Sequence, residues 1–394
     1  MLKFNKNYGF EGKSLMQKRF LLFLLITAYY RIDSIAVSQN RQVVQFKPQA
    51  FSEYLHFNRA EGLYLGLGTQ IKVIDASVYI SGGYAISARR WQYNTGLGMV
   101  RRYRFGTMRM DARLYDKTRA VGSSNIGFGG NSVSALFFKQ DHLDYFVEKG
   151  VAVSLVNSVR HWKLAVKVER EKNVSIPLAT RKSLSCRNIA FRGNPEIDAG
   201  DYHSVSLKID FDKVETPGVY PKGYQYQVEL TKAGGRLLFG SFNFLQVGFA
   251  SRICLRGLWS HLFRVNLDAG GSRQSLPKQY CFYLGGPTTL RSEPVNKYAG
   301  NHYWFLSVDH FLPPGPLTVV RFPNPFFYSL HPIVFADAGS TWTSAKIWDQ
   351  PKEFYSSFGL AIGDTGNLFR VNCAWSFDRM KSAPLWTILF SYPW

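Results

Sequence analysis

Two histidines and an aspartate lie close together in the sequence, as the catalytic groups of a hydrolase would. His302 and His310 flank one short segment, and Asp309 directly precedes His310. The segment alternates apolar and polar residues, which predicts a strand, and neighbouring residues of a strand point to opposite faces. Asp309 and His310 therefore cannot form a dyad within that strand, and we predict that the protein is not an enzyme.

The other histidines and the cysteines form no metal-binding pattern. The eight histidines are dispersed along the chain, and the four cysteines, Cys186, Cys254, Cys281 and Cys373, include no pair at the spacing of a zinc site. We expect no metal and no cofactor. The spacing leaves open whether the cysteines form disulfides.

The chain is strongly basic, with a formal net charge of +21. Its positive residues are scattered along the predicted strands, as at Arg109 and Arg113, instead of forming a run or a helix face. A nucleic-acid-binding protein usually concentrates such charge in a patch or stripe. The scatter favours a polar lumen and contact with anionic lipid and lipopolysaccharide of an outer membrane, and we expect no binding to nucleic acid.

Alternation of apolar and polar residues is the main structural signal. It is clearest in residues 204–212, 224–231 and 368–378, where every second residue is apolar. Such a period of two places the apolar set on one face of a strand. The opposite set includes charges such as Lys208 and Asp210, which a dry core would not accept but a water-filled or plugged lumen does. An aromatic content of 16% and 34 glycines fit the same class.

The sequence predicts an all-β fold, a transmembrane antiparallel β-barrel of about 16 strands. Besides the three segments above, twelve others alternate: 61–73, 75–87, 91–104, 107–118, 147–157, 161–171, 239–250, 256–269, 301–312, 330–340, 353–363 and 384–394. Closed bacterial barrels usually have an even number of strands, so we expect a sixteenth near 40–47 or 184–192. A short helix is expected near 125–140. A soluble β-sandwich is the alternative.

The N-terminal region has the pattern of a secretory signal. Lys18 and Arg19 precede an apolar run at 20–30, and Ala36-Val37-Ser38 offers small residues at a cleavage site. We predict a signal peptide at 1–38, with Met16 as a possible start, a short periplasmic segment at 39–55 and a barrel at 56–394. The expected location is the bacterial outer membrane.

The last segment of the chain carries a row of aromatic residues. Trp386, Ile388, Phe390, Tyr392 and Trp394 alternate with smaller or more polar residues. Aromatic side chains on the outward face suit the interfacial girdle of a membrane barrel. An exposed edge with these side chains would invite aggregation in a soluble sheet. The segment therefore predicts the closing strand of a barrel.

Three segments resemble the outer-membrane assembly factors and bacterial surface antigens of the BamA/TamA type. Residues 57–63 (FNRAEGL) resemble the start of that family's first barrel strands. Residues 283–292 (YLGGPTTLRS) are similar to its sixth outer loop, and residues 335–339 (FADAG) to a later strand. The resemblance covers about residues 50–394, and the order of the segments matches.

The resemblance implies a loop folded into the lumen and held there by an arginine. Arg291 would be that arginine, Asp337 and Asp309 its acidic partners on the wall, and Gly285 and Gly286 the turn before it. Ser292 and Glu293 depart from the family pattern, and Glu293 is an alternative partner for Arg291. No periplasmic POTRA domain fits before the barrel, so a barrel of this type would have to work with a periplasmic or outer-membrane partner protein or do something else.

The family resemblance implies a role in inserting or exporting proteins through a seam between the first and last strands. Gly66 and Gly68 would weaken the first strand, near 63–72, and Phe390, Tyr392 and Trp394 mark the last. An unsealed edge can pair with an incoming strand. The alternative is a passive or structural transport barrel, a pore whose basic lumen favours anions.

Overall fold

The fold was analysed in a computed structural model. It describes residues 44–48, 54–122, 126–185, 189–215, 221–236, 238–257, 261–313, 330–344, 353–366, 368–379 and 383–390. The predicted signal peptide at 1–38 lies outside the described residues. In the part of the chain that is described, no helix is long and apolar enough to cross a membrane.

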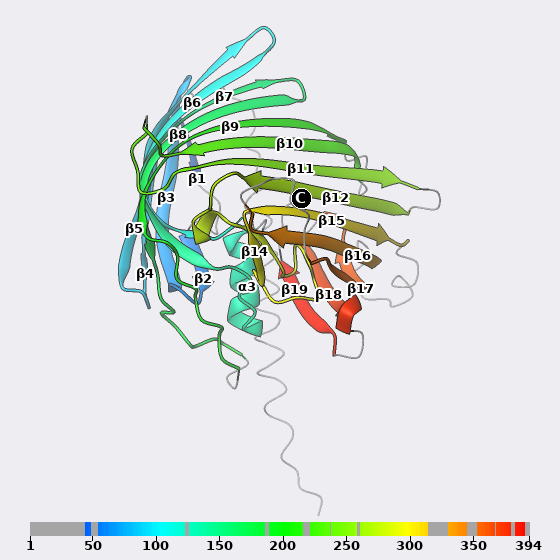
Figure 1. The fold of residues 1–394 in the computed structure, drawn as a ribbon. Helices are drawn as coiled ribbons and strands as arrows, with labels where there is room; N and C mark the ends of the chain where they lie inside the picture. Colours follow the sequence, from blue (N-terminus) through cyan, green and yellow to red (C-terminus); the bar gives the residue numbers. More distant parts are fainter. Residues whose placement is uncertain are drawn as a thin grey trace, which may run out of the picture.

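One long antiparallel sheet curls around to form the wall of the molecule (Figure 1). Its strands follow chain order, and each pairs with the next. They are β3 (Gly62–Val73), β4 (Ala76–Ala85), β5 (Arg90–Tyr103), β6 (Gly106–Ala120), β7 (Tyr145–Val159), β8 (Trp162–Ser175), β9 (Gly200–Glu215), β10 (Lys222–Ala233), β11 (Phe244–Arg256), β12 (Leu262–Ser272), β15 (His302–Phe311), β16 (Leu330–Trp342), β17 (Tyr355–Asp364), β18 (Phe369–Ser376) and β19 (Leu385–Phe390). Each of the fifteen predicted segments overlaps one of these strands, although β11 begins only at Phe244 within the segment 239–250, and residues 391–394 of the last segment are not described.

A broken first strand precedes β3. It consists of β1 (Val44–Pro48) and β2 (Leu55–Asn58), which both pair antiparallel with β3. Pro48 faces Thr69 and Leu55 faces Leu65. The expected strand near 40–47 is therefore present as β1, and the described residues of 184–192 contain none. The predicted boundary at residue 56 is wrong for residues 44–48, which belong to the sheet.

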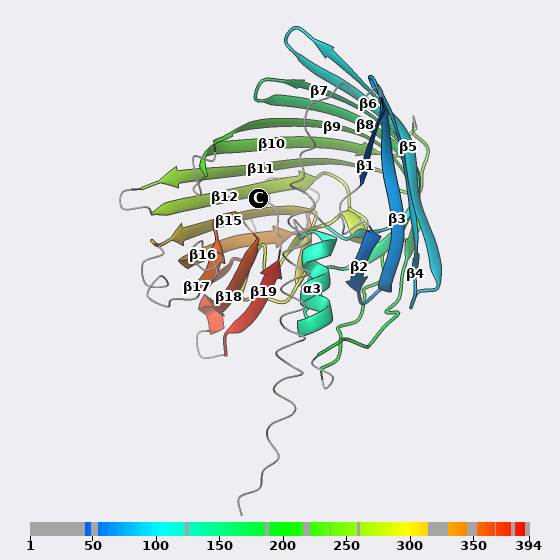
Figure 2. The same ribbon diagram turned by 180° about the vertical axis from the view of Figure 1, so that it is seen from behind.

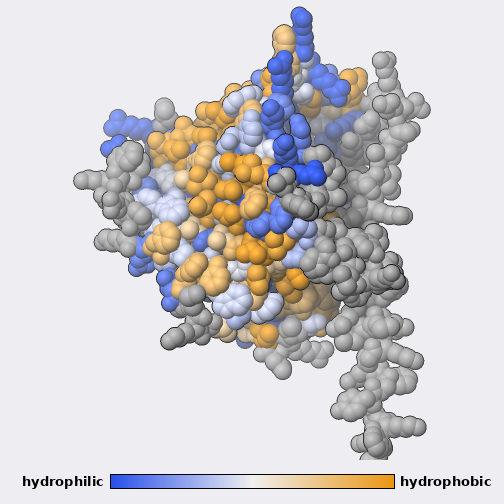
Figure 3. Space-filling view, turned by 90° about the vertical axis from the view of Figure 1, so that its right-hand side faces the viewer, coloured by the Kyte–Doolittle hydropathy of each residue, from blue (hydrophilic) through white to orange (hydrophobic). Residues whose placement is uncertain are grey.

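The two faces of the wall have opposite character. On β8, Leu164, Val166 and Val168 are exposed, whereas Glu169 and Glu171, which follow them on the opposite face, are buried. Exposed apolar residues recur on the outer face of most strands, and Figure 3 shows apolar side chains gathered over one side of the molecule. An apolar outer face around a charged interior is the pattern of a membrane barrel and not of a soluble sandwich.

Two long connections pack against the sheet. One, from β12 to β15, lies inside the lumen, and the other, from β6 to β7, lies at the ends of the sheet. The connection from β12 to β15 contains the 3-10 helix η2 (Lys278–Tyr280) and the strands β13 (Phe282–Leu284) and β14 (Tyr298–Gly300), which pair with each other. The connection from β6 to β7 contains helix α3 (Phe128–Phe138), which confirms the helix predicted near 125–140. A second 3-10 helix, η4 (Phe377–Arg379), follows β18.

Candidate functional site

The structure brings Arg291 together with the acidic residues expected to bind it. Nε of Arg291 donates to Asp337 across 2.8 Å, and Nη1 donates to Asp309 across 2.6 Å. Nη2 donates to Ser307 across 2.8 Å and also to Asp337. Burial alone would lower the pKa of Arg291, but the two carboxylates raise it above its usual range. The guanidinium therefore stays charged although only 4% of the residue is exposed.

The two carboxylates belong to neighbouring strands of the wall. Asp309 lies on β15 and Asp337 on β16, and Ser307 faces Asp337 in the register. Arg370 on β18 also donates to Asp309, across 2.8 and 3.0 Å. Arg291 lies over the ring of Phe335, 3.7 Å from its centroid. We call Arg291, Ser307, Asp309, Asp337 and Arg370 the Arg291 cluster; its two arginines balance its two aspartates.

Gly285 and Gly286 form the turn that leads into the loop. Their φ values are +112° and +103°, a region that side chains strongly disfavour. A Cβ on Gly285 would lie 2.3 Å from the carbonyl oxygen of Pro294. The N–H of Gly286 donates to the backbone carbonyl of Glu293 across 2.9 Å, which closes the loop on itself. The glycines therefore set the shape that delivers Arg291 to the wall.

The residues that depart from the family pattern do not take part in the Arg291 cluster. Glu293 accepts from Lys297 across 2.6 Å, so the alternative pairing of Glu293 with Arg291 is not the one formed. The Ser292 hydroxyl is buried without a hydrogen-bond partner.

A second buried arginine lies in the turn between β2 and β3. Arg59 is fully buried, and its Nη2 donates to Asp144 across 2.5 Å. Its Nη1 lies 3.2 Å from Asp141, and its backbone N–H donates to the same residue across 2.9 Å. We call Arg59, Asp141 and Asp144 the Arg59 cluster. It joins the first strand to the connection that carries α3. The sequence showed Arg59 only within a family segment, because its partners lie more than 80 positions away.

Glu61 fixes the same turn from the other side. Its carboxylate accepts hydrogen bonds from Asn58 and Gln92 and lies 3.0 Å from Nε2 of His56. Burial would raise its pKa, but the contact with His56 and the hydrogen bonds lower the pKa to about 2. Oδ1 of Asn58 accepts from the N–H of Ala60 and of Glu61, which closes a tight turn.

Helix α3 lies between the two ends of the sheet (Figure 2). Among the described residues, paired registers run from β1 and β2 through to β19, but none joins β19 to β1 or β2. On one side, Ser132 accepts from the N–H of Phe57, across 2.8 Å. On the other, the Ser134 hydroxyl donates to the carbonyl of Ile388, also across 2.8 Å. We call this junction of β2, α3 and β19 the seam.

The residues predicted for the seam fall in three places. Gly66 and Gly68 lie on β3, which is the second strand and pairs with β4, so the prediction that β3 is the seam strand is wrong. A strand near 40–47 was expected but was not assigned to the seam, and β2 was not predicted because its four residues are too few to show alternation. Phe390 is at the seam, stacked on Phe138 of α3. Tyr392 and Trp394 lie outside the described residues.

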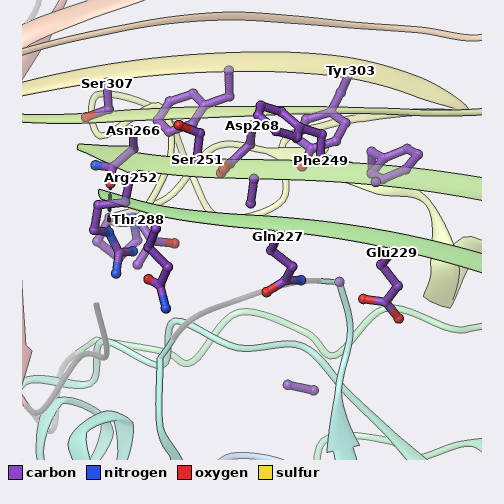
Figure 4. Close-up of a pocket in the computed structure, with 18 of the residues that line it drawn as sticks. Gln227, Glu229, Phe249, Ser251, Arg252, Asn266, Asp268, Thr288, Tyr303 and Ser307 are labelled. Atoms are coloured by element: carbon purple, nitrogen blue, oxygen red, sulfur yellow. Dashed lines mark hydrogen bonds between the residues drawn. The ribbon is translucent and has the colours of Figure 1, made fainter. Parts of the chain in front are cut away.

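A polar cavity of about 510 Å³ occupies the lumen next to the in-folded loop. Figure 4 shows Gln227, Glu229, Arg252 and Asp268 projecting from neighbouring strands toward it. Ser307, Asp309 and Arg370 also line it, so the Arg291 cluster forms part of its wall. In the part of the chain described, no three metal-ligating residues come together.

No family model matches the chain, and no curated protein matches its sequence. Its fold is similar to that of solved structures. With BamA from Haemophilus ducreyi lacking POTRA domains 1–3, the TM-score is 0.54 at 11% identity, over 89% of this chain and 70% of that one. CdiB from Acinetobacter baumannii gives a TM-score of 0.44 at 12% identity, over 89% and 60%. Pseudomonas aeruginosa OpdK with vanillate gives 0.35 at 11%, over 88% and 93%.

The likeness to BamA shows the fold. The chain is an antiparallel β-barrel protein of that architecture, as its apolar outer face and charged interior indicate. An identity of 11% does not carry a function from one chain to the other.

Proposed function

We propose that the protein is an outer-membrane barrel that helps to insert or export other proteins through its seam. The observation that carries this proposal is the arrangement of the sheet ends: within the described residues, β2 and β19 meet through α3 and not through a strand ladder. A strand edge that is covered by side chains, and not by another strand, can be uncovered. It then offers backbone groups to an incoming strand.

The first strand is suited to this role because it is short and interrupted. β1 and β2 contribute only five and four residues, and residues 49–54 separate them. This side of the seam is therefore held mainly by the Arg59 cluster and by the contacts of α3.

The Arg291 cluster supports the proposal by fixing the loop that fills the lumen. Leu284 and Leu290, on either side of the turn, pack with Phe305 of the wall. A loop held by buried charge pairs and packed leucines keeps the lumen plugged while the seam opens to an incoming strand. Leakage through the outer membrane would otherwise accompany each opening.

We also propose contact with anionic lipid and a partner protein. Arg101, Arg102 and Arg104 are exposed around the turn from β5 to β6, beside the exposed rings of Tyr103 and Phe105. Aromatic and basic residues together suit the headgroup region of a membrane. We propose that a separate protein captures unfolded clients and delivers them to the barrel. Co-purification from outer membranes would identify it.

Depletion of the protein tests the proposed function. The abundance of all other outer-membrane barrel proteins would be measured by mass spectrometry before and after depletion. A fall in several of them, reversed by a plasmid copy, is the expected result. Unchanged abundance of every other barrel would refute an assembly role.

The polar cavity is the observation that favours a second candidate, a passive pore. Planar-bilayer conductance separates the two candidates. Closed or flickering behaviour is expected of a barrel plugged by the Arg291 cluster, whereas a large steady conductance supports a pore. Anion selectivity would follow from the basic residues of the lumen, such as Arg252.

A further inference from the structure

The edge of β19 that faces the seam carries backbone groups that another strand would normally bind. The N–H and C=O of Ile388 and the C=O of Trp386 point the same way, because residues two apart in a strand share an edge. The opposite edge pairs with β18. Each of these three groups is satisfied in the structure by a side chain from residues 134–142.

Gln140 takes the position that one residue of a neighbouring strand would take. Its Nε2 donates to the carbonyl of Trp386 across 3.1 Å, and its Oε1 accepts from the N–H of Ile388 across 3.0 Å. A residue of a parallel strand forms the same two bonds with its own N–H and C=O, whereas a residue of an antiparallel strand would form both with one residue. The amide side chain therefore imitates a strand at the edge of β19.

Two further side chains complete the cover. The hydroxyl of Ser134 donates to the carbonyl of Ile388, and Nε2 of His142 lies 3.1 Å from the same oxygen. The buried face of α3 consists of small residues, including Ser134 and Ala135, so the helix can lie close to the backbone of β19. Phe138 stacks on Phe390 beside these contacts.

Contacts within α3 and the turn after it fix the conformation of the cover. Lys139 ends the helix in a left-handed conformation, with φ of +55°, which turns the chain back toward β19. Nδ2 of Asn131 donates to Asp141 across 3.0 Å, and Oδ1 of Asn131 accepts from the N–H of His142 across 2.8 Å. The cover is thus a formed element that could leave the edge as a unit, and not a loop that happens to touch it.

We propose that residues 134–142 are an autoinhibitory cover on the edge of β19, which an incoming β-strand must displace. This inference rests on the proposed seam function and adds to it the element that keeps the seam closed at rest. The occupant that competes for the edge is an extended peptide with alternating apolar and polar residues. Such a peptide replaces the side-chain bonds of the cover by a full ladder.

The test uses the full-length barrel in detergent micelles and two readouts. The first is hydrogen exchange at the Ile388 amide. The second is binding of a fluorescent peptide with the sequence of residues 204–212, SVSLKIDFD, which alternates and is soluble. The same peptide with Leu207→Pro is the control, because proline cannot donate to a ladder.

Gln140→Leu removes the strand-like amide at nearly constant size. The matched control is Gln274→Leu, because Oε1 of Gln274 also accepts a backbone N–H, that of Leu245 across 3.0 Å, but far from β19 along the sheet. In Gln140→Leu we expect exchange at Ile388 and affinity for the peptide each to rise about tenfold, which corresponds to about 1.4 kcal/mol. Gln274→Leu is expected to match the wild type in both.

Unchanged exchange and binding in Gln140→Leu would overturn the inference. Faster exchange without peptide binding would also overturn it, because the cover would then protect an edge that no strand uses. If Gln140→Leu does not fold, Ser134→Ala serves instead, since alanine suits a helix. Tighter peptide binding combined with normal abundance of other barrels after depletion would keep this inference and reject the proposed function.

Discussion

Asn296 donates to Asp144 across 2.7 Å, and this bond joins the in-folded loop to the connection that carries α3. Asp144 also binds Arg59. Asp144 lies two residues after the cover. Its carboxylate therefore contacts both the turn after β2 and the loop that holds Arg291. The plug of the lumen and the closure of the seam are physically connected at this residue.

Loss of this bond is expected to loosen the cover and leave the barrel intact. Asn296→Ala removes one hydrogen bond to a charged group, a contribution of about 1.5–3 kcal/mol. Proteolysis within residues 121–144 should become faster, while the thermal unfolding of the sheet changes little. Equal proteolysis of wild type and variant would show that the two regions are independent.

Removal of Arg291 is expected to destabilise the barrel strongly. Arg291→Ala leaves Asp337 buried without its guanidinium partner, and loss of one partner of a buried pair costs about 3–5 kcal/mol. The urea midpoint of unfolding in micelles measures the effect. Lys297→Ala is the control, because it removes the more exposed pair with Glu293, which contributes at most about 1 kcal/mol. Similar midpoints for both variants would contradict the role of Arg291.

Arg59 is expected to hold the seam more than the barrel as a whole. Arg59→Ala leaves Asp141 without its arginine partner and takes one of two arginines from Asp144, which keeps Arg192. Hydrogen exchange should therefore rise in β2 and α3 first. Arg109→Ala, which breaks the half-exposed pair with Asp111, serves as the control and should leave both elements unchanged. Exchange that rises uniformly over all strands would contradict a local role.

Acid is expected to loosen the cover. Burial lowers the pKa of His142 from 6.5 to about 4, so folding favours the neutral imidazole over the protonated one. Because the folded pKa lies below the unfolded one, this stability is fully present above pH 6.5 and is lost as the pH falls toward 4. Exchange at Ile388, corrected for its intrinsic pH dependence, should rise over that window. His142→Gln keeps a donor and should abolish the pH dependence; a dependence that persists would point to another group.

The sequence was sufficient for the strands of the wall but not for the seam. Strands such as β8 and β9 are long, and their alternation is a local property that can be read directly. Arg291 and its aspartates were found through a family resemblance and not from spacing, since the three residues lie on separate elements. The role of Arg59 and the contact of Gln140 with Ile388 depend on residues between about 80 and 250 positions apart. No local pattern encodes such contacts.

The most direct test of the seam is photo-cross-linking in living cells. A benzophenone amino acid would replace Trp386, which lies on β19 with 58% of its surface exposed. Val166, an exposed residue on β8, would carry the probe as the control. The account predicts adducts with newly made outer-membrane proteins at Trp386 and none at Val166. An absence of such adducts at Trp386, or equal adducts at both positions, would contradict it.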